Sequence, residues 1–329
     1  MSKDYSQLVK NLKARRYDDS IGEHILSPSF YKTVLGDSVK YTLESMLEVD
    51  KVYSHKLYSI VQRIQDLLEL NLRNRKIEVE FRYLGAHASD CHIRLFDDVE
   101  LVVIPKKIGD KPAKAVELLA GEILQILDQT NSFNKLDYGD KCRIFLQTPS
   151  PVCDISILPA VWVDSSLYRE SKLEINRGIC EYNLEKQTRK MYLPFLAIAR
   201  LNARDRKVKG GLKSLIRLVR NIKEDAEDRF ELSFDEICGV VYDISDKELT
   251  VDQDHLLSLL TPLSDKLEKL VTDDKYRRKL ISPSKKEYVF HNKDHKAEDL
   301  KKLKNFLDEL IEDLPKDLEN KMLIDPIPY

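Results

Sequence analysis

The sequence lacks several features that would assign the protein to a class at once. Its 329 residues hold no apolar run near the length of about 18 residues that a membrane-spanning helix needs. The five cysteines form no CxxC pair, which favours reduced thiols over a disulfide framework. The N-terminal stretch has no apolar segment like that of a signal peptide. These absences predict a cytoplasmic protein with no membrane partner.

The chain also lacks an excess of charge of either sign. Its formal net charge is −2, although charged residues make up 33% of the sequence. This balance gives no case for a nucleic-acid coat protein or a membrane-surface protein. The short basic clusters KARR and DKYRRK have no interleaved aromatic residues, so binding of nucleic acid is left open.

Hydrophobic periodicity predicts where the helices and strands lie. Apolar residues at helical spacing predict one long helix over residues 38–72, whereas alternation predicts a half-buried strand over 76–85. Further strands are expected at 99–105, 141–147 and 152–160, with shorter ones at 161–163, 178–183 and 190–195, and further helices at 112–128, 212–230, 254–272 and 296–314.

This order of elements predicts an α+β fold with two domains. The strands fall between residues 77 and 193 and would form a mixed sheet, whereas the chain behind them is helical. We therefore expect a core with its N-terminal helices over residues 1–195 and a helical domain over 196–329. The long N-terminal helix is expected to pack along both.

Three carboxylates stand at the starts of buried strands. Asp98 and Glu100 are two residues apart and share one face of their strand, whereas Asp97 points to the other face and is not expected to be a ligand. Asp154 has the same relation to the apolar run of a later strand. If the two strands are neighbours, the three acids converge and need a cation such as Mg²⁺ or Mn²⁺. The alternative is that they are ordinary solvated carboxylates at strand ends.

The combination resembles the signature of the DNA polymerase β-like nucleotidyltransferase superfamily. Gly85-Ala86 takes the place of its Gly-Ser turn, Asp98-Val99-Glu100 that of its acidic pair, and Asp154 in CDISILPA that of its third acid. The spacing of 13 positions from Gly85 to Asp98 is similar to that in cyclic GMP–AMP synthase.

The resemblance continues downstream, so that it covers roughly residues 55–225. NRGICEYNLEKQTRKMYLP and LNARDRKVKGGLKSLIRLVRNIK are similar to the corresponding stretch of oligoadenylate synthases and of bacterial cGAS/DncV-like nucleotidyltransferases. Two residues depart from the pattern. Ala86 replaces the usual serine of the turn, and Glu100 replaces the commoner aspartate.

The resemblance implies an enzyme that joins nucleoside triphosphates and releases pyrophosphate. Its product would be a cyclic di- or trinucleotide second messenger, as in bacterial anti-phage (CBASS) signalling, and a protein regulator or effector would be a partner. Asp98 and Glu100 would hold Mg²⁺ or Mn²⁺. Asp154 would join them as a metal ligand and help to deprotonate the attacking ribose hydroxyl.

Nucleotide-binding residues are expected in the turn and on a basic helix. In the turn they are Gly85, Ala86 and Ser89, whose hydroxyl could replace the missing one. On the helix after Gly211, Lys213 and Arg220 would contact the triphosphate, whereas Arg217 is expected at the surface.

Two alternative functions follow from the same residues. Ala86 and Glu100 would also suit a nucleotide-binding sensor or scaffold that has lost catalysis. A third hypothesis is transfer of a nucleotide onto tRNA or protein, against which the near-neutral charge argues mildly.

Overall fold

The computed structural model describes residues 3–16, 36–49, 51–93, 98–130, 132–139, 142–149, 152–183 and 185–322. These residues form two compact units. The helical unit takes its described residues from 1–50, 91–94 and 201–329, and the sheet unit takes its own from 51–90 and 95–200.

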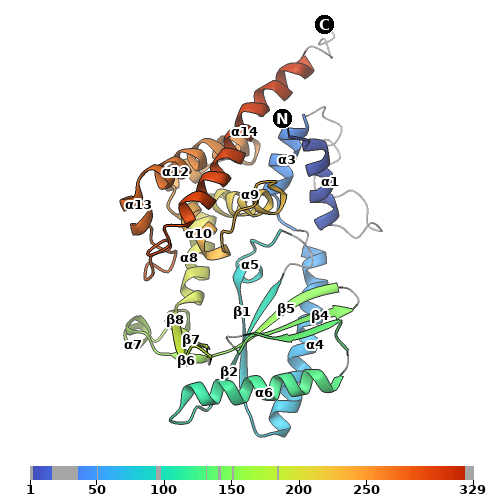
Figure 1. Cartoon of the computed structure of the whole chain (residues 1–329), viewed down its shortest axis with the longest axis vertical. Coiled ribbons are helices and arrows are strands. Elements are labelled where there is room, and N and C mark those ends of the chain that lie inside the picture. Colours follow the sequence, from blue (N-terminus) through green and yellow to red (C-terminus); the bar gives the residue numbers. More distant parts are fainter. Residues whose placement is uncertain are drawn as a thin grey trace. The chain divides into compact units, whose positions relative to one another are not determined.

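The sheet unit is built on five strands in the order β1-β2-β5-β4-β3 (Figure 1). Strands β2 and β5 run parallel, whereas the other neighbours are antiparallel. This mixed sheet confirms the predicted α+β class. The strands are β1 (Val79–Leu84), β2 (Val99–Pro105), β3 (Lys135–Tyr138), β4 (Ile144–Pro149) and β5 (Val152–Pro159).

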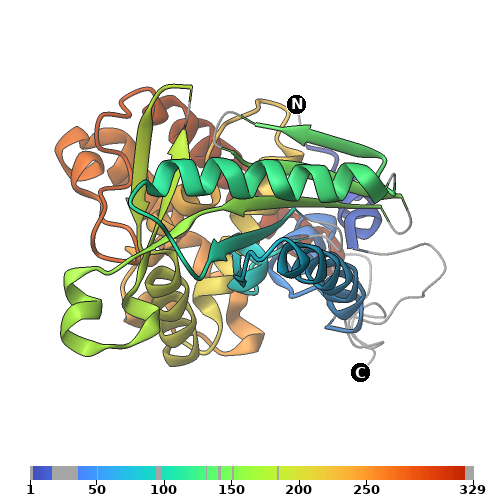
Figure 2. The ribbon, with the colours of Figure 1, turned by 90° about the horizontal axis from the view of Figure 1, so that it is seen from below.

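Two helices cover one face of this sheet. Helices α4 (Lys51–Asn74) and α6 (Pro112–Thr130) pack on it, and α6 runs across the sheet in Figure 2. Alternate residues of β2, such as Leu101 and Val103, are fully buried against these helices. Burial of the alternating apolar side chains is what fixes the register of the strands.

Part of the opposite face is covered by a second, three-stranded sheet. Its order is β6 (Val161–Val163), β7 (Gly178–Asn183) and β8 (Thr188–Tyr192). Val102 and Leu158 of the large sheet pack with Ile179 of β7 in a separate apolar cluster. Between β6 and β7 lie α7 (Ser166–Ser171) and the short 3₁₀ helix η1 (Glu174–Asn176), and α8 (Pro194–Lys207) follows β8.

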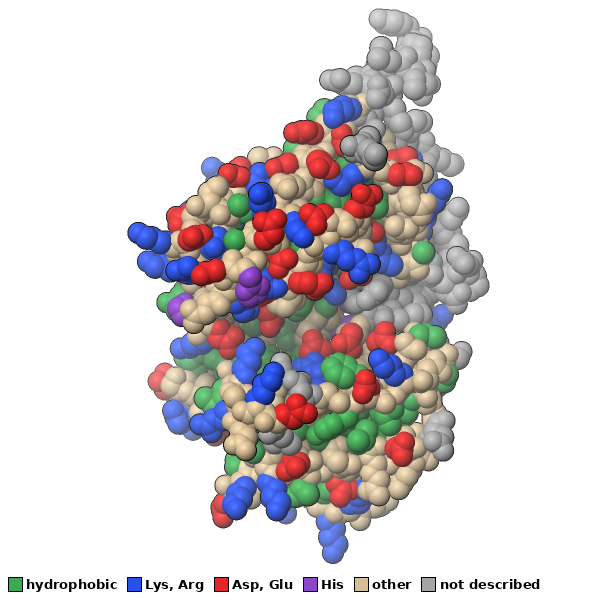
Figure 3. All heavy atoms as spheres, viewed as in Figure 1, with side chains coloured by type: hydrophobic (Ala, Val, Ile, Leu, Met, Phe, Trp, Pro, Cys, Tyr) green, Lys and Arg blue, Asp and Glu red, His purple; other side chains and the backbone are tan. Residues whose placement is uncertain are grey.

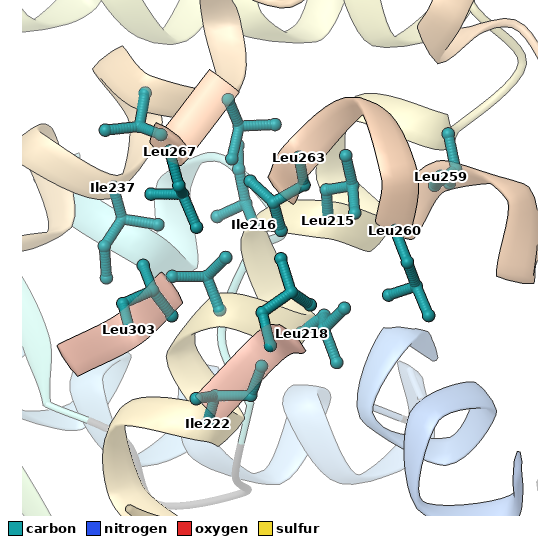
Figure 4. Packing of buried hydrophobic residues seen from close by; sticks show 14 of the residues in the cluster. Leu215, Ile216, Leu218, Ile222, Ile237, Leu259, Leu260, Leu263, Leu267 and Leu303 are labelled. Carbon is teal, nitrogen blue, oxygen red and sulfur yellow. The ribbon is translucent and has the colours of Figure 1, made fainter. Parts of the chain in front are cut away.

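The helical unit packs around α9 (Gly211–Asp225). Leu215, Leu218 and Ile222 of α9 point into the apolar cluster shown in Figure 4. The remaining elements of this unit are α1 (Tyr5–Arg16), α3 (Asp37–Met46), α10 (Phe234–Tyr242), α11 (Asp246–Leu249), η2 (Gln253–Leu259), α12 (Leu260–Thr272), α13 (Asp274–Lys279) and α14 (Lys296–Met322).

The predicted single helix over residues 38–72 is wrong, because the chain forms α3 and α4 there. Helix α3 ends at Met46, and Leu47 has an extended backbone with ψ 153°. The Ser45 carbonyl accepts a hydrogen bond from Asn221 Nδ2, and the Met46 carbonyl accepts one from Arg217 Nε. These side chains of α9 satisfy carbonyls at the end of α3, so the helix can stop there.

The division of the chain differs from the predicted one. Helices α1 and α3 belong to the helical unit rather than to the core with the strands, since Leu12 and Tyr41 are buried in the apolar cluster around α9. The later change of unit falls at residues 200–201, within α8. Apolar periodicity cannot reveal this grouping, because it predicts which face of a helix is buried but not which other element packs against that face.

The surface of the described residues shows no bias toward one sign of charge in the view of Figure 3, where basic and acidic side chains are interspersed. Within the described residues, no helix is both long and apolar enough to cross a membrane.

Candidate active site

The parallel pair of strands β2 and β5 brings the segments that carry the predicted acids next to each other in the large sheet. Val99 pairs with Ile155, and Glu100 pairs with Ser156. Since side chains alternate along a strand, Glu100 shares a face with Ser156 and Asp154, whereas Asp98 immediately precedes β2. The predicted neighbourhood of the two acid-bearing strands is therefore confirmed. Asp98 and Asp154 are exposed, and Asp97 lies outside the described residues.

Glu100 takes part in a polar network that is largely shielded from solvent. Its Oε2 accepts a hydrogen bond of 2.9 Å from Arg143 Nη1, which also donates to Ser156 Oγ at 2.9 Å. The second amino group of Arg143 donates to Glu181 Oε1 at 3.2 Å. The Arg143 side chain is 18% exposed, so these bonds are shielded from competing water.

Tyr192 completes this network from β8. Its hydroxyl donates to Glu181, the same carboxylate that pairs with Arg143. Burial and the nearby Glu181 carboxylate raise the pKa of Tyr192, so the phenol keeps its proton and remains a donor.

The other oxygen of Glu100 lies against the glycine turn. Gly85 has a φ of +68°, and a Cβ atom added there would lie 2.4 Å from Glu100 Oε1. The conformation thus favours glycine, and a methyl group there would require the end of the Glu100 side chain to shift. Gly85 begins the single turn α5 (Gly85–Ala88), and Ala86 in it is buried.

Ser89 does not offer its hydroxyl proton to a ligand. The residue is fully buried, and its Oγ donates to the Gly85 carbonyl at 2.9 Å, so it stabilises the turn from within. The hypothesis that Ser89 replaces the hydroxyl missing at Ala86 is therefore corrected.

Asp154 is oriented by its neighbour on β4. Gln147 Nε2 donates to Asp154 Oδ1 at 2.8 Å, and the two residues face each other in the antiparallel register of β4 and β5. A hydrogen bond to an exposed carboxylate limits its rotation and leaves its second oxygen in a defined direction.

The chemistry of these donors fits Mg²⁺ or Mn²⁺ in part. Asp98, immediately before β2, and Asp154, within β5, offer the carboxylate oxygens that hard cations prefer. Among the described residues, however, no three acidic, histidine or cysteine side chains form a group that could hold a metal ion. Glu100 is bound to Arg143 instead. The three-carboxylate metal site therefore stays a prediction.

The basic helix α9 is much more buried than expected. Arg217 was predicted at the surface, yet it is only 4% exposed, and its Nε donates to the Met46 carbonyl at 2.8 Å. Arg220 donates to the Cys91 carbonyl at 2.7 Å. Lys213 is also buried, and its backbone N–H donates to Asp205. These bonds give Arg217 and Arg220 structural roles within the helical unit. Contacts of Lys213 and Arg220 with a nucleotide stay predictions.

Sequence reasoning missed Arg143 and Gln147. Both belong to the predicted strand KCRIFLQ, in which residues 143, 145 and 147 share a face. That alternation was the available signal. It could not reveal the partners, because the order of the strands in the sheet was unknown.

A glycine turn, an acidic pair at the start of one strand and a third acid on the adjacent parallel strand form the arrangement that the resemblance to DNA polymerase β-like nucleotidyltransferases predicts. Comparison with known proteins makes the assignment narrower. No family model matches the chain. It is 26% identical over 342 residues to a c-di-GMP synthase of Capnocytophaga granulosa, covering 92% of this chain and 95% of that protein. A c-di-GMP synthase from a Lachnospiraceae bacterium is 25% identical over 352 residues, covering 94% of this chain and 99% of that protein.

Solved structures agree with this comparison. The STING-associated CdnE c-di-GMP synthase from Capnocytophaga granulosa superposes with a TM-score of 0.79 and 28% identity, covering 95% of this chain and 99% of that one. The CdnE c-UMP-AMP synthase of Rhodothermus marinus, at 14% identity and a TM-score of 0.60, shares the fold. The chain is therefore similar, over nearly its whole length, to cyclic dinucleotide synthases in sequence and in fold.

Proposed function

We propose that the protein joins two nucleoside triphosphates into a cyclic dinucleotide and releases pyrophosphate, with GTP as substrate and c-di-GMP as product. The observation that supports the proposal is the parallel pairing of β2 with β5, in which Val99 is opposite Ile155; Asp98 and Asp154 are the residues that immediately precede these two. The relatives that are c-di-GMP synthases favour GTP. The STING-associated relative favours an anti-phage (CBASS) role, with a protein effector that responds to the product.

In the proposed reaction, a ribose hydroxyl attacks the α-phosphorus of the second triphosphate. The bond from the α-phosphorus to the pyrophosphate oxygen breaks, and the hydroxyl proton passes to Asp154. In a second transfer, the remaining ribose hydroxyl of the linear product attacks the α-phosphorus of its remaining triphosphate, which closes the ring and releases a second pyrophosphate. Asp98 and Asp154, with Glu100, would hold Mg²⁺ or Mn²⁺. The bound ion would supply positive charge that stabilises the attacking oxygen and the leaving pyrophosphate. Gln147 keeps the Asp154 carboxylate oriented for its role.

Mass spectrometry of the products formed from all four nucleoside triphosphates with Mg²⁺ or Mn²⁺ tests this proposal. We expect c-di-GMP, and we expect Asp98→Asn and Asp154→Asn to abolish it. Asp66→Asn is a matched control, because Asp66 is an exposed aspartate on α4 that also accepts a bond from a glutamine, Gln62. Absence of any cyclic product from the intact protein would refute the proposal.

One observation favours a second candidate, a nucleotide-binding sensor without turnover. Glu100 is engaged by Arg143, and Ala86 offers no hydroxyl in the turn. Calorimetry with GTP distinguishes the two functions. Tight binding without product, unchanged in Ala86→Ser, would support the sensor, whereas turnover would exclude it.

A further inference from the structure

Strand β4 carries an exposed aromatic side chain on the face of the large sheet that also holds Asp154. Ile144 and Leu146 of this strand are buried in the apolar cluster with α4 and α6. Phe145 alternates with them, so it points to the opposite face, where it is 40% exposed. Polar residues are usual at the solvated positions of antiparallel strands. Phe145 therefore offers an apolar surface that a ligand could bury.

The ring of Phe145 is held close to the backbone of the neighbouring chain segment. A Cβ atom added to Gly139 would lie 3.0 Å from Phe145 Cε2. The Gly139 N–H donates to the Arg143 carbonyl at 2.8 Å, which extends the pairing of β3 with β4 by one more bond. The missing side chain of Gly139 thus makes room for the ring. A ring that is already supported loses little conformational freedom when a planar ligand stacks on it.

An exposed carboxylate lies next to this ring on β3. Asp137 pairs directly with Phe145, and the Cβ atoms of such a pair are about 4.5–5.5 Å apart on one face. Asp137 is exposed, and its Oδ1 accepts a hydrogen bond of 2.9 Å from the Tyr138 backbone N–H. This bond limits the rotation of the carboxylate. The aromatic ring therefore has an oriented acceptor group beside it.

Asp154 lies on the other side of the same ring. Phe145 pairs with Ser156 of β5, and Asp154 comes two residues before Ser156. Asp154 is therefore the diagonal neighbour of Phe145, about 7–8 Å away on the same face. Across the strands, the order is Asp137, Phe145 and Asp154. A purine nucleotide has the same order of parts, since its Watson–Crick edge and its ribose lie at opposite ends of the planar base.

We propose that Phe145 and Asp137 bind the guanine base of the nucleotide whose ribose hydroxyl attacks. The base stacks on Phe145, and Asp137 accepts hydrogen bonds from guanine N1–H and N2–H. A carboxylate accepts hydrogen bonds and donates none. Adenine has an unprotonated N1 at that edge, so Asp137 disfavours it. The inference rests on the proposed function and deepens it, because it assigns the choice of GTP to two named residues.

A competing explanation is that Phe145 only covers Gly139, as aromatic residues do beside glycines of edge strands. Two substitutions distinguish this role from stacking. Phe145→Leu keeps an apolar side chain over Gly139 but has no aromatic face. Phe145→Tyr keeps the aromatic face.

Isothermal titration calorimetry of the full chain with GMP and with AMP measures the base site without turnover, because a monophosphate has no pyrophosphate to release. We expect Phe145→Leu to weaken GMP binding by about 5- to 100-fold, the range for loss of one base–aromatic stack, and Phe145→Tyr to change it by no more than about twofold. Tyr138→Leu is the matched control. Tyr138 is 44% exposed on β3, but it pairs with the buried Ile144 and so points to the other face. Its GMP affinity should stay within about twofold of that of the intact protein.

Asp137→Asn tests the choice of base. Asparagine keeps an oxygen for the Tyr138 N–H and replaces the other by an amino group that donates. The ratio of GMP to AMP affinity should fall by about 10-fold or more. The ratio of kcat/KM for GTP to that for ATP in cyclic product formation should fall in parallel. A merely structural role of Asp137 would instead weaken both nucleotides equally and overturn its assignment.

The remaining outcomes are also decisive. Unchanged GMP affinity in folded Phe145→Leu would overturn the inference, as would an intact protein that binds GMP no more tightly than AMP. If that protein still makes c-di-GMP, the proposed function stands without the inference. GMP binding that depends on Phe145 and Asp137, with no cyclic product, would refute the proposed function alone. If Phe145→Leu does not fold, Asp137→Asn at its exposed position still decides, because an unchanged ratio of GMP to AMP affinity overturns the inference.

Discussion

Replacing Gly85 by alanine tests how closely the glycine turn and Glu100 depend on each other. Gly85 has a φ of +68°, in the left-handed region. This conformation costs a residue with a Cβ about 1–2 kcal/mol. The smaller freedom of alanine in the unfolded chain offsets about 0.4–1 kcal/mol of that cost. The backbone alone therefore predicts a net loss of about 1 kcal/mol in the free energy of unfolding.

The added methyl group also meets Glu100. It would lie 2.4 Å from Glu100 Oε1, so the carboxylate must move. Its Oε2 is bound to Arg143 at 2.9 Å, and the Glu100 side chain is only 29% exposed. Loss of a hydrogen bond between charged groups costs about 1.5–3 kcal/mol. Gly85→Ala should therefore lower the free energy of unfolding by about 2.5–4 kcal/mol in total.

Gly210→Ala is the matched control for this prediction. Gly210 has a φ of +91°, and nothing lies within 4 Å of an added Cβ. The free energy of unfolding of Gly210→Ala should fall only by the backbone contribution of about 1 kcal/mol. Urea unfolding of both variants measures the difference, and Mn²⁺ titration reports whether Glu100 has moved. Equal losses for the two variants, with unchanged Mn²⁺ affinity for Gly85→Ala, would show that Glu100 is not held against the turn.

Three further predictions concern groups with defined partners. R217M leaves the buried Met46 carbonyl without its donor, so urea unfolding should show a loss of about 1–3 kcal/mol. S89A removes a bond inside the turn, so the free energy of unfolding should fall while the KM for GTP stays unchanged. Burial raises the pKa of Glu236, but hydrogen bonds from Lys293 and a backbone N–H outweigh burial, and the net pKa lies below 4.5. Its stabilisation is present above pH 4.5 and is lost as the pH falls through the lowered pKa, and E236Q should flatten this acid limb of the unfolding profile.

Local patterns predicted the strands better than the long helix. Hydrophobic patterns located β1, β2, β4 and β5: alternation predicted β1, and an apolar run predicted the more fully buried β2. Strand β3 was missed, since its four residues KLDY are mostly exposed and are too few for their alternation to stand out. The break between α3 and α4 was missed because the hydrogen bonds that end α3 come from α9, about 170 residues away along the chain.

The candidate site could be predicted only as far as the acids themselves. The spacing of Asp98 and Glu100 fixes their shared face, and the apolar runs predict buried strands. The location of Arg143 against Glu100 depends on strand order, which one sequence does not contain. The basic face of α9 shows the opposite failure. Arg217 was expected at the surface and Arg220 at a triphosphate, yet the two side chains donate to the backbone carbonyls of residues 46 and 91.

The contacts of Glu100 explain why this position holds glutamate rather than the commoner aspartate. The Glu100 carboxylate spans from the Gly85 turn at Oε1 to Arg143 at Oε2. An aspartate is one methylene shorter, so it could not keep both contacts from the same backbone position. The glutamate is therefore matched to Arg143 and to the glycine turn. The Glu100→Asp variant therefore distinguishes a glutamate that supports activity from one that reduces it. If Glu100→Asp retains product formation but weakens Mn²⁺ binding, the glutamate supports catalysis through its two contacts. If Glu100→Asp instead increases turnover, the bond to Arg143 restrains the enzyme.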